Sequence, residues 1–278
     1  MEKGYIELQL TDLQLADFYN EDYQQEYAKD AGLKENQYLL IKDKTNEVID
    51  KYCYQNGKLR PVKYNVIQNI YSNKIKPRNI QQELAADMLI DKNSKIKMVR
   101  GVYGSGKDFL MLNQALSLLE KGKFQKIVFI RPNVTVANVP DIGFLKGSME
   151  EKLAWTLGPF YDKVGGEEGV RQLIDQGKLE LVSLLFIRGR SFDDSIVYVT
   201  EGQNITTEIA KLIISRIGEN TELWINCDTH QVDKKVYEQD NGIMKMIERL
   251  SGNPLFSYIY LPKTERSEVA ELCTLLDD

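Results

Sequence analysis

Residues 95–107 of the 278-residue chain read KIKMVRGVYGSGK, and this stretch is the strongest indication of its fold. A short apolar segment, IKMVR, runs directly into a glycine-rich turn that begins at Gly101. Residues 109–120, an apolar segment with helical character, follow the turn. A buried strand, a glycine-rich loop that carries a lysine, and a helix in this order are the context of a phosphate-binding P-loop.

The chemistry of such a loop explains why these residue types occur at this spacing. Glycines allow backbone N–H groups to turn inward around phosphate oxygens, and the helix N-terminus adds the positive end of its dipole. A lysine then supplies a point charge for the β- and γ-phosphates. The residues expected to bind the nucleotide in this way are Gly101, Gly104, Ser105, Gly106 and Lys107. The alternative is a glycine-rich turn without a ligand, and the ordered series favours nucleotide binding over it.

The residue after the loop departs from the P-loop motif. A Ser or Thr normally follows the lysine and binds magnesium through its hydroxyl, but residue 108 is an aspartate. The second nucleotide motif should be an apolar strand ending in an aspartate that supports the same metal ion. The candidate strand is IVYVTE, residues 196–201, which has Thr200 at that place. Asp108 and Thr200 therefore exchange the usual hydroxyl and carboxylate.

Two interpretations of this exchange stay open. The two side chains face each other across the metal in P-loop folds, so a swap conserves one hydroxyl, one carboxylate and the local charge. In that interpretation Asp108 and Thr200 hold Mg²⁺ together, with Asp108 as the closer anionic ligand, and Glu201 at the strand end activates the attacking water. In the other, the site has decayed to nucleotide binding without hydrolysis. We favour the swap, because an Asp108 carboxylate near phosphates without a metal is repulsive.

Beyond residue 80 the chain alternates between helical and strand-like segments. Short segments rich in β-branched and aromatic residues recur: KIVFIRP, LELVSLLFI, SIVYVTE, ELWINCD and FSYIYLP. Between them, ITTEIAKLIISRI has its apolar residues at helical spacing. This alternation predicts an α/β fold for residues 75–278, a P-loop NTPase with a parallel sheet flanked by helices.

Residues 1–74 differ from the rest, being rich in Tyr and Gln with short apolar runs. We expect a small α+β domain there, with a helix over residues 15–32 and a hairpin turn at Asn56-Gly57. The stretch SNKIKPRN, from Ser72, is expected to serve as a linker.

This N-terminal region is a candidate nucleic-acid-binding or interaction module. Its tyrosines interleave with basic residues, as they do in a stacking groove, although tyrosines that alternate in strands are more often half-buried sheet surface. The residues concerned are Tyr52, Tyr54, Tyr64, Tyr71, Lys51, Lys58, Arg60 and Lys63.

The composition excludes several classes of protein. A hydrophobic content of 42% and a charged content of 28% are those of an ordinary soluble globular chain. A net charge of −5 argues against a wholly basic nucleic-acid-coating protein, but it leaves room for a local basic groove. The single histidine, His230, excludes most histidine-based zinc sites. Three widely separated cysteines indicate free thiols in a reducing compartment, and no apolar run approaches a membrane span, so we expect a cytoplasmic protein without a membrane partner.

Further motifs follow in a fixed order along the chain. Residues 78–82 are similar to an Asn-x-x-Gln segment, residues 130–134 to Thr-Arg-Pro, and residues 141–147 to Ile-Gly-Phe-Leu-Pro-Gly. Residues 188–191 are similar to Arg-Gly-Arg-Ser, residues 200–204 to Asp-Glu-Ala-Gln-Asn, and residues 227–233 to Gly-Asp-x-x-Gln-x-Asp. The set covers about 77–267 and resembles the PhoH-like ATPases, whose core is similar to that of superfamily 1 helicases. The N-terminal part resembles the segment that follows a PIN nuclease domain in longer members; this sequence has no such domain, so we expect no RNase role.

The resemblance implies roles for individual residues. Gln82 would contact adenine, which favours ATP, and Asp228 and Gln231 would lie near the γ-phosphate. Arg131, Arg188 and Arg190 are arginine-finger or nucleic-acid candidates, because guanidinium groups suit the charge of a phosphoryl transition state. Ordinary ion pairs are the alternative for each arginine.

The expected function is Mg²⁺-dependent ATP hydrolysis coupled to single-stranded RNA or DNA. The catalytic candidates are Lys107, Glu201, Arg188 and Arg190, and the resemblance implies a homo-oligomer, for example a ring that supplies arginines across its interfaces. The alternative is a nucleotide-dependent regulatory or scaffold protein that does not turn over. The helicase-like series disfavours a small-molecule kinase.

Overall fold

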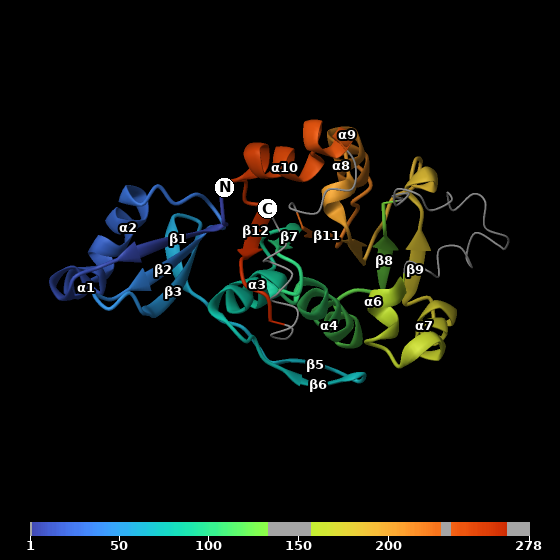
Figure 1. Ribbon diagram of the computed structural model, residues 1–278, viewed down its shortest axis with the longest axis horizontal. Helices are drawn as coiled ribbons and strands as arrows, with labels where there is room; N and C mark the ends of the chain where they lie inside the picture. The colour runs from blue at the N-terminus through green and yellow to red at the C-terminus, as the bar shows by residue number, and fades with distance from the viewer. Residues whose placement is uncertain (1, 133–156, 229–234, 266–278) are drawn as a thin grey trace.

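The computed structural model describes residues 2–132, 157–228 and 235–265. Its centre is a six-stranded sheet with parallel pairings throughout, in the order β12-β7-β11-β10-β8-β9 (Figure 1). The strands are β7 (Ile96–Gly101), β8 (Lys126–Ile130), β9 (Leu179–Val182), β10 (Ser195–Val199), β11 (Glu222–Cys227) and β12 (Phe256–Leu261). This sheet and the helices around it confirm the predicted α/β fold of a P-loop NTPase.

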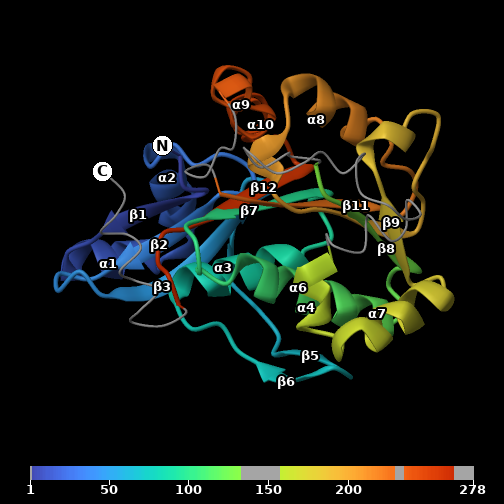
Figure 2. The ribbon, with the colours of Figure 1, turned by 45° about the vertical axis from the view of Figure 1, so that its right-hand side comes forward.

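Helices cover both faces of the sheet (Figure 2). One face carries α3 (Ile80–Ile90), α4 (Lys107–Glu120), α6 (Gly158–Tyr161) and α7 (Gly166–Asp175). The other carries α8 (Thr207–Ile214), α9 (Lys235–Gln239) and α10 (Gly242–Leu250). Two short 3-10 helices, η3 (Leu184–Phe186) and η4 (Gly202–Asn204), complete this part of the chain.

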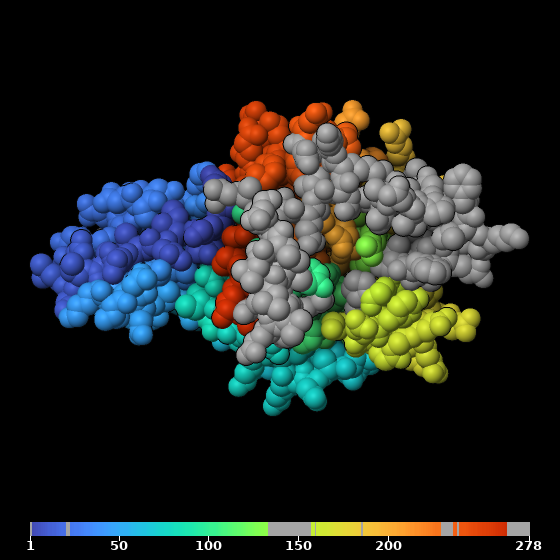
Figure 3. Space-filling view, viewed as in Figure 1, coloured from blue at the N-terminus to red at the C-terminus, as the bar shows by residue number. Residues whose placement is uncertain are grey.

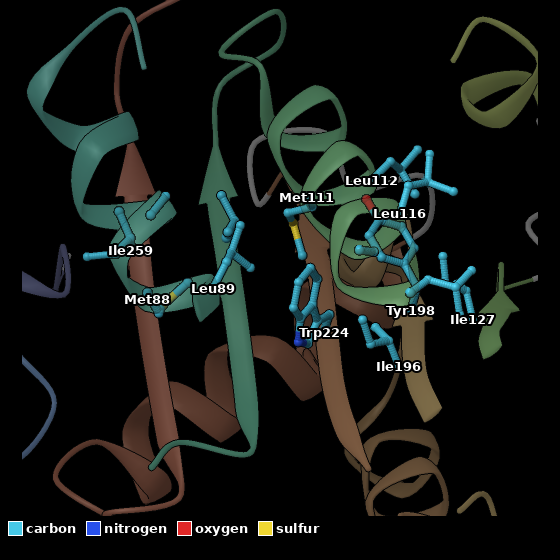
Figure 4. Close-up of a cluster of buried hydrophobic side chains, with 14 of the residues drawn as sticks. Met88, Leu89, Met111, Leu112, Leu116, Ile127, Ile196, Tyr198, Trp224 and Ile259 are labelled. Carbon is cyan, nitrogen blue, oxygen red and sulfur yellow. The ribbon is translucent and has the colours of Figure 1, made fainter. Parts of the chain in front are cut away.

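Each face of the sheet has its own hydrophobic core. Successive residues of a strand point to opposite faces, so Tyr198 packs in the core on the α4 side and Val199 in the core on the α10 side. Figure 4 shows the first core, where Met111 and Leu116 of α4 meet side chains from the strands. Every strand of this sheet is therefore covered on both faces, as parallel sheets require.

Polar side chains fix where several helices begin. The side chains of Asn79, Thr206 and Asn241 accept backbone N–H groups in the first turns of α3, α8 and α10. Such caps satisfy donors that have no partner within the helix. None of the helices in the described ranges combines the length and apolarity that a bilayer crossing requires.

The N-terminal residues form a separate four-stranded sheet in the order β1-β2-β3-β4. Its elements are β1 (Tyr5–Gln9), α1 (Asp12–Phe18), α2 (Glu21–Asp30), β2 (Tyr38–Lys42), β3 (Val48–Gln55) and β4 (Lys58–Pro61). Asn56 and Gly57, between β3 and β4, have φ values of 53° and 75°. Positive φ at both central residues is what a two-residue hairpin turn needs, so the predicted hairpin is confirmed.

Two local expectations for this region are corrected. Residues 15–32 contain parts of two helices instead of one: α1 begins at Asp12, after the capping box of Thr11 and Gln14, and ends at Phe18, and α2 begins at Glu21. Residues from Ser72, expected as a linker, begin with β6 (Ser72–Ile75), which pairs with β5 (Ile67–Asn69). Ile67 and Ile75 form a small buried cluster with Leu110 of α4, so this hairpin packs beside the phosphate loop.

The N-terminal sheet docks on α3 through a buried carboxylate. Asp87 of α3, which is 1% exposed, accepts both terminal nitrogens of Arg60, the Tyr38 hydroxyl and the Lys63 N–H. Next to β12, the Tyr260 N–H donates to the carbonyl of residue 3. In Figure 3 these N-terminal residues, in blue, form one end of the molecule.

Candidate nucleotide-binding site

The phosphate loop joins the end of β7 to the start of α4. Gly104 and Gly106 have φ values of 72° and 85°, in the left-handed region that residues with a side chain rarely adopt. A Cβ atom on Gly106 would also lie 3.0 Å from Nε2 of Gln82. The backbone therefore requires glycine at both positions, which are two of the positions that the motif predicts.

A cleft of about 590 Å³ opens around this loop. Among the described residues that line it, the carboxylates are Asp108, Asp162, Glu201, Asp228 and Glu265. The cationic side chains of the same lining are Lys76, Arg78, Lys107 and Lys163. Because the carboxylates outnumber the cations, a ligand with several phosphate charges needs an additional cation in order to bind well.

Lys107 lies against the loop itself. Its Nζ donates to the carbonyl oxygens of Gly101 and Val102, both at 2.8 Å, and lies 3.9 Å from Oδ2 of Asp228. Burial lowers the pKa of the Lys107 ammonium from its ordinary value, while the Asp228 carboxylate acts in the opposite direction. The structure thus brings together two predicted site residues, Lys107 and Asp228, which are far apart in sequence.

Gln82, the predicted adenine contact, holds the phosphate loop. Its Nε2 donates to the Ser105 carbonyl at 3.0 Å, and its Oε1 accepts the Arg78 N–H at 2.8 Å. Both Gln82 and Ser105 are buried. A primary amide has two donors and two lone pairs, so Gln82 can contact a base while it keeps these two bonds.

The exchanged pair, Asp108 and Thr200, meets different partners. Oδ1 of Asp108 accepts the hydroxyl of Tyr198, a β10 residue, at 2.7 Å. Thr200 follows β10 directly, is 1% exposed, and donates its N–H to the Ile130 carbonyl. Asp108 lines the cleft, whereas Thr200 is not among the described lining residues. Joint metal binding by Asp108 and Thr200 stays a prediction.

Glu201 stands at the end of β10 with a φ of 53°. One oxygen of its carboxylate accepts Nε2 of the buried Gln203 at 2.7 Å, and Oε1 of Gln203 accepts the Asp228 N–H at 3.0 Å. A guanidinium nitrogen of Arg131 lies 3.8 Å from the other Glu201 oxygen. At the edge of the cleft, Glu201 therefore lies near Arg131 and is linked to Asp228 through the Gln203 side chain.

The two remaining predicted arginines lie elsewhere. Arg190 forms an ion pair with Glu180 of β9, and its guanidinium stacks over the Phe192 ring at 4.8 Å. Arg188 is exposed. Neither residue is among those that line the cleft of its own chain.

Several cleft residues were missed by the sequence argument. Glu265 donates its N–H to the Gly104 carbonyl, and its own carboxylate and carbonyl accept Asn79 and Arg78 side chains. Its place shortly after β12, at the edge where parallel strands end, is the signal that identifies it. Lys163 lies 4.8 Å from the Phe109 ring, and the sequence has no local pattern that joins these two.

Three members of the predicted N-terminal stacking groove, Tyr52, Arg60 and Lys51, are engaged within the fold, whereas Lys58, Lys63 and Tyr64 are exposed. Tyr52 is buried with its ring edge-to-face on Phe18, as the half-buried sheet interpretation expects. Arg60 is bound to Asp87, and Lys51 pairs with Glu83 at 2.6 Å. These members of the predicted stacking groove therefore do not present a free ring and free charges.

Part of the predicted site lies outside the described residues. This applies to Gln231, the second expected γ-phosphate contact, and to His230 beside it. It also applies to the motif at residues 141–147.

Comparison with known proteins assigns this cleft to a family. The family described as PhoH-like protein matches residues 74–274. The chain belongs to this PhoH-like family. Because this is a P-loop family, membership supports nucleotide binding in general, and the loop and cleft described above are the candidate site.

Individual PhoH-like relatives extend the match. Protein PhoH2 of Bacillus subtilis (strain 168) is 29% identical over 284 residues, covering 98% of this chain and 63% of that protein. Protein PhoH2 of Thermobispora bispora is 33% identical over 204 residues, covering 72% of this chain and 47% of that protein. The PhoH-like protein of Bacillus subtilis (strain 168) is 31% identical over 188 residues, or 66% of this chain and 57% of that protein. The chain thus spans from about half to less than two thirds of these relatives' lengths.

The donors at this PhoH-like site fit magnesium. In the part of the chain that the structure describes, no three His, Cys, Asp or Glu side chains cluster as an all-protein metal site. Mg²⁺ beside phosphates usually takes only one or two carboxylates and completes its shell with water and phosphate oxygens. Asp108, in the first turn of α4 beside Lys107, supplies such a carboxylate.

Proposed function

We propose that this PhoH-like chain is a Mg²⁺-dependent ATPase whose turnover is coupled to single-stranded RNA or DNA. The observation that carries the proposal is the meeting of Lys107, Asp228 and Glu201 at one cleft. A phosphate-binding cation, a carboxylate beside it and a carboxylate at the strand edge are the groups that phosphoryl transfer to water requires. Because the chain spans only part of its relatives, the activity is proposed from the site itself.

Recognition of ATP rests on Gln82. Its side chain is buried at the start of α3, where it is fixed by the Arg78 N–H and the Ser105 carbonyl. A fixed amide presents one donor and one acceptor in a defined direction, which matches the N6 and N7 edge of adenine. The same amide supports the phosphate loop, so base recognition and phosphate binding share one side chain.

The magnesium ligands in this proposal are Asp108 and Thr200. Asp108 is the anionic member, and it adds to the excess of carboxylates in the cleft that a bound divalent cation would offset. When bound, Mg²⁺ neutralises phosphate charge that develops during transfer. The structure supports Asp108 more directly than Thr200, because only Asp108 lines the cleft.

The exchange of this pair can be tested by reversing it. Asp108→Thr alone and Thr200→Asp alone should each reduce phosphate release, since each leaves two hydroxyls or two carboxylates. The double variant should recover activity if the two side chains act on one metal ion. Independent, additive losses would remove Thr200 from the metal site.

Activation of water is assigned to Glu201. Gln203 donates to one oxygen of its carboxylate at 2.7 Å and sets its direction, while Arg131 lies 3.8 Å from the other oxygen at the surface. A carboxylate in that position accepts the proton of the attacking water or orients the water through a hydrogen bond.

Arg188 and Arg190 enter the proposal as residues that act across a subunit boundary. Neither lines the cleft of its own chain, so a catalytic role for them requires a neighbouring copy. A homo-oligomer, for example a ring, meets that requirement, and a mixture of Lys107→Ala and Arg188→Ala chains tests it. Recovery of activity in the mixture supports arginines supplied between copies, and absence of recovery contradicts it.

Phosphate release from ATP and Mg²⁺ tests the function directly, with and without single-stranded RNA or DNA. Lys107→Ala should abolish release, whereas Lys121→Ala, at the opposite end of α4 and exposed, should not. Stimulation by one nucleic acid would support the coupling. Equal release by wild type and Lys107→Ala would assign the activity to a contaminant and reject the proposal.

A nucleotide-dependent regulatory protein is the second candidate function. The burial of Thr200 favours it, because a metal site that lacks one ligand binds nucleotide better than it hydrolyses it. Tight binding of ATP without release of phosphate, under every nucleic acid tried, would support this candidate.

A further inference from the structure

Tyr198 of β10 is a polar residue flanked by the apolar residues Val197 and Val199. It is 0% exposed, its ring stacks on Phe129 at 5.7 Å with an interplanar angle of 10°, and it belongs to the core between the sheet and α4. Figure 4 shows its side chain beside Leu112 and Leu116 of α4. Packing of this kind holds the ring, and therefore the hydroxyl at its end, in one place.

The hydroxyl of Tyr198 meets the exchanged residue of the phosphate loop. It donates to Oδ1 of Asp108 at 2.7 Å, across 90 residues of sequence. A buried hydroxyl without a partner is costly, and an apolar side chain would fill a core position at less cost. The hydrogen bond to Asp108 therefore explains why this strand position has a tyrosine.

We propose that Tyr198 is a positioning residue that holds Asp108 as a ligand for the divalent cation. The carboxylate of Asp108 has two oxygens, and Tyr198 engages Oδ1 from the core side. Asp108 also lines the cleft, so the second oxygen is the one that this orientation presents to a cation. The inference rests on the proposed function and adds to it a residue that the P-loop motifs do not contain.

Tyr198, and not Thr200, supplies the hydroxyl that contacts Asp108. The two residues are separated by two positions and so point to the same face of the sheet. The longer tyrosine side chain reaches Asp108 from further down the strand, while Thr200 is buried where the strand ends. The hydroxyl and carboxylate are thus paired in this protein, but with the hydroxyl outside the cleft.

The Tyr198 hydroxyl approaches Asp108 from the buried core and does not itself line the cleft. An outer hydrogen bond of this kind fixes the orientation of a metal-binding carboxylate.

Tyr198→Phe tests the inference, because it removes the hydroxyl and keeps the stacked ring. The readout is the affinity for a fluorescent ATP analogue, titrated with Mg²⁺ and repeated in excess EDTA. We expect Tyr198→Phe to raise, by about tenfold or more, the Mg²⁺ concentration that gives half of the maximal increase in affinity for the ATP analogue. Affinity measured in EDTA should change little, since the loop and Lys107 are untouched.

Tyr38→Phe is the matched control. Tyr38 is equally buried and donates to another carboxylate, Asp87, at 2.8 Å in the N-terminal interface. Its loss should leave the Mg²⁺ dependence unchanged, even where the midpoint of urea unfolding falls. An equal shift of the Mg²⁺ dependence in Tyr38→Phe would assign the effect to general loosening and overturn the inference.

A second pair of variants separates loss of the contact with Asp108 from a general change in packing. In an Asp108→Ala background, Tyr198→Phe should have no further effect on the Mg²⁺ dependence, because Tyr198 acts through Asp108. An additional shift in that background would overturn the inference. Unshifted Mg²⁺ dependence in Tyr198→Phe would overturn it too, and the proposed function would stand. If the affinity of the wild-type protein for the ATP analogue did not depend on Mg²⁺, both the inference and the proposed function would be overturned.

Discussion

The side-chain oxygen of Gln203 accepts the backbone N–H of Asp228 at 3.0 Å, while the nitrogen of the same amide donates to Glu201 at 2.7 Å. One buried amide thus joins the ends of β10 and β11, where the proposed water-activating carboxylate and the proposed γ-phosphate contact lie. Because an amide has a fixed donor side and acceptor side, the two carboxylate residues are oriented together.

Replacement of Gln203 by leucine should separate binding from turnover. Loss of both hydrogen bonds frees the Glu201 carboxylate, so we expect phosphate release to fall roughly a hundredfold with a smaller change in nucleotide affinity. Gln55→Leu, a buried glutamine of the N-terminal sheet that bonds to Asn36, serves as the control for removing a buried amide. If affinity and turnover of Gln203→Leu fell by the same factor, Gln203 would have no separate role in positioning Glu201.

Nucleotide affinity should fall on the alkaline side because of Lys107. Burial lowers the pKa of its ammonium below the ordinary 10.5, so the positive charge is lost at a lower pH than in an exposed lysine. Only the charged form attracts phosphate, and the affinity therefore decreases as the pH rises through this lowered pKa. An arginine stays charged over this range, so the affinity of Lys107→Arg, measured by fluorescence titration, should fall less steeply. Parallel curves would contradict the assignment.

Gly106→Ala should impair nucleotide binding beyond its effect on stability. Its φ of 85° is strained for alanine, and the new Cβ would crowd Nε2 of Gln82 at 3.0 Å. Gly122 also has a positive φ, 64°, but a Cβ there meets nothing within 4 Å. Both alanine variants should lose roughly 1–2 kcal/mol of folding stability, and only Gly106→Ala should lose affinity. Equal affinity loss in both would contradict the role of the Gln82 contact.

Removal of the Asp87 carboxylate should destabilise the interface between the N-terminal sheet and α3. Asp87→Ala leaves Arg60 and Tyr38 without their buried acceptor, and we expect the free energy of unfolding to fall by about 3 kcal/mol. Asp12→Ala, which breaks an ion pair with Lys44 that is 68% and 73% exposed at its two side chains, should lower the free energy of unfolding far less. Urea unfolding followed by circular dichroism measures both variants. A small loss for Asp87→Ala would mean that the interface is held by its apolar contacts.

Asp108 and Thr200 show which structural details a sequence motif predicts and which it does not. The sequence predicts that Asp108 needs a compensating hydroxyl, and it selects Thr200 because the motif has its partner at that position. The structure places the Tyr198 hydroxyl on Asp108, and joint metal binding by Asp108 and Thr200 stays a prediction. Motif spacing gives the strand and the face of the sheet, but side-chain length and packing determine which residue of that face makes the contact.

Local sequence patterns predict the phosphate loop, the alternation of strands and helices, and the Asn56-Gly57 hairpin. These features depend on backbone preferences and on periodicity within a few residues, so a short stretch of sequence is enough to predict them. Three sets of hydrogen bonds are visible only in the tertiary structure: those of Gln203 with Glu201 and Asp228, that of Glu265 with the phosphate loop, and that of Tyr198 with Asp108. Those contacts join residues from different strands and helices, and the order of strands in the sheet, which no local pattern contains, brings them within hydrogen-bonding distance.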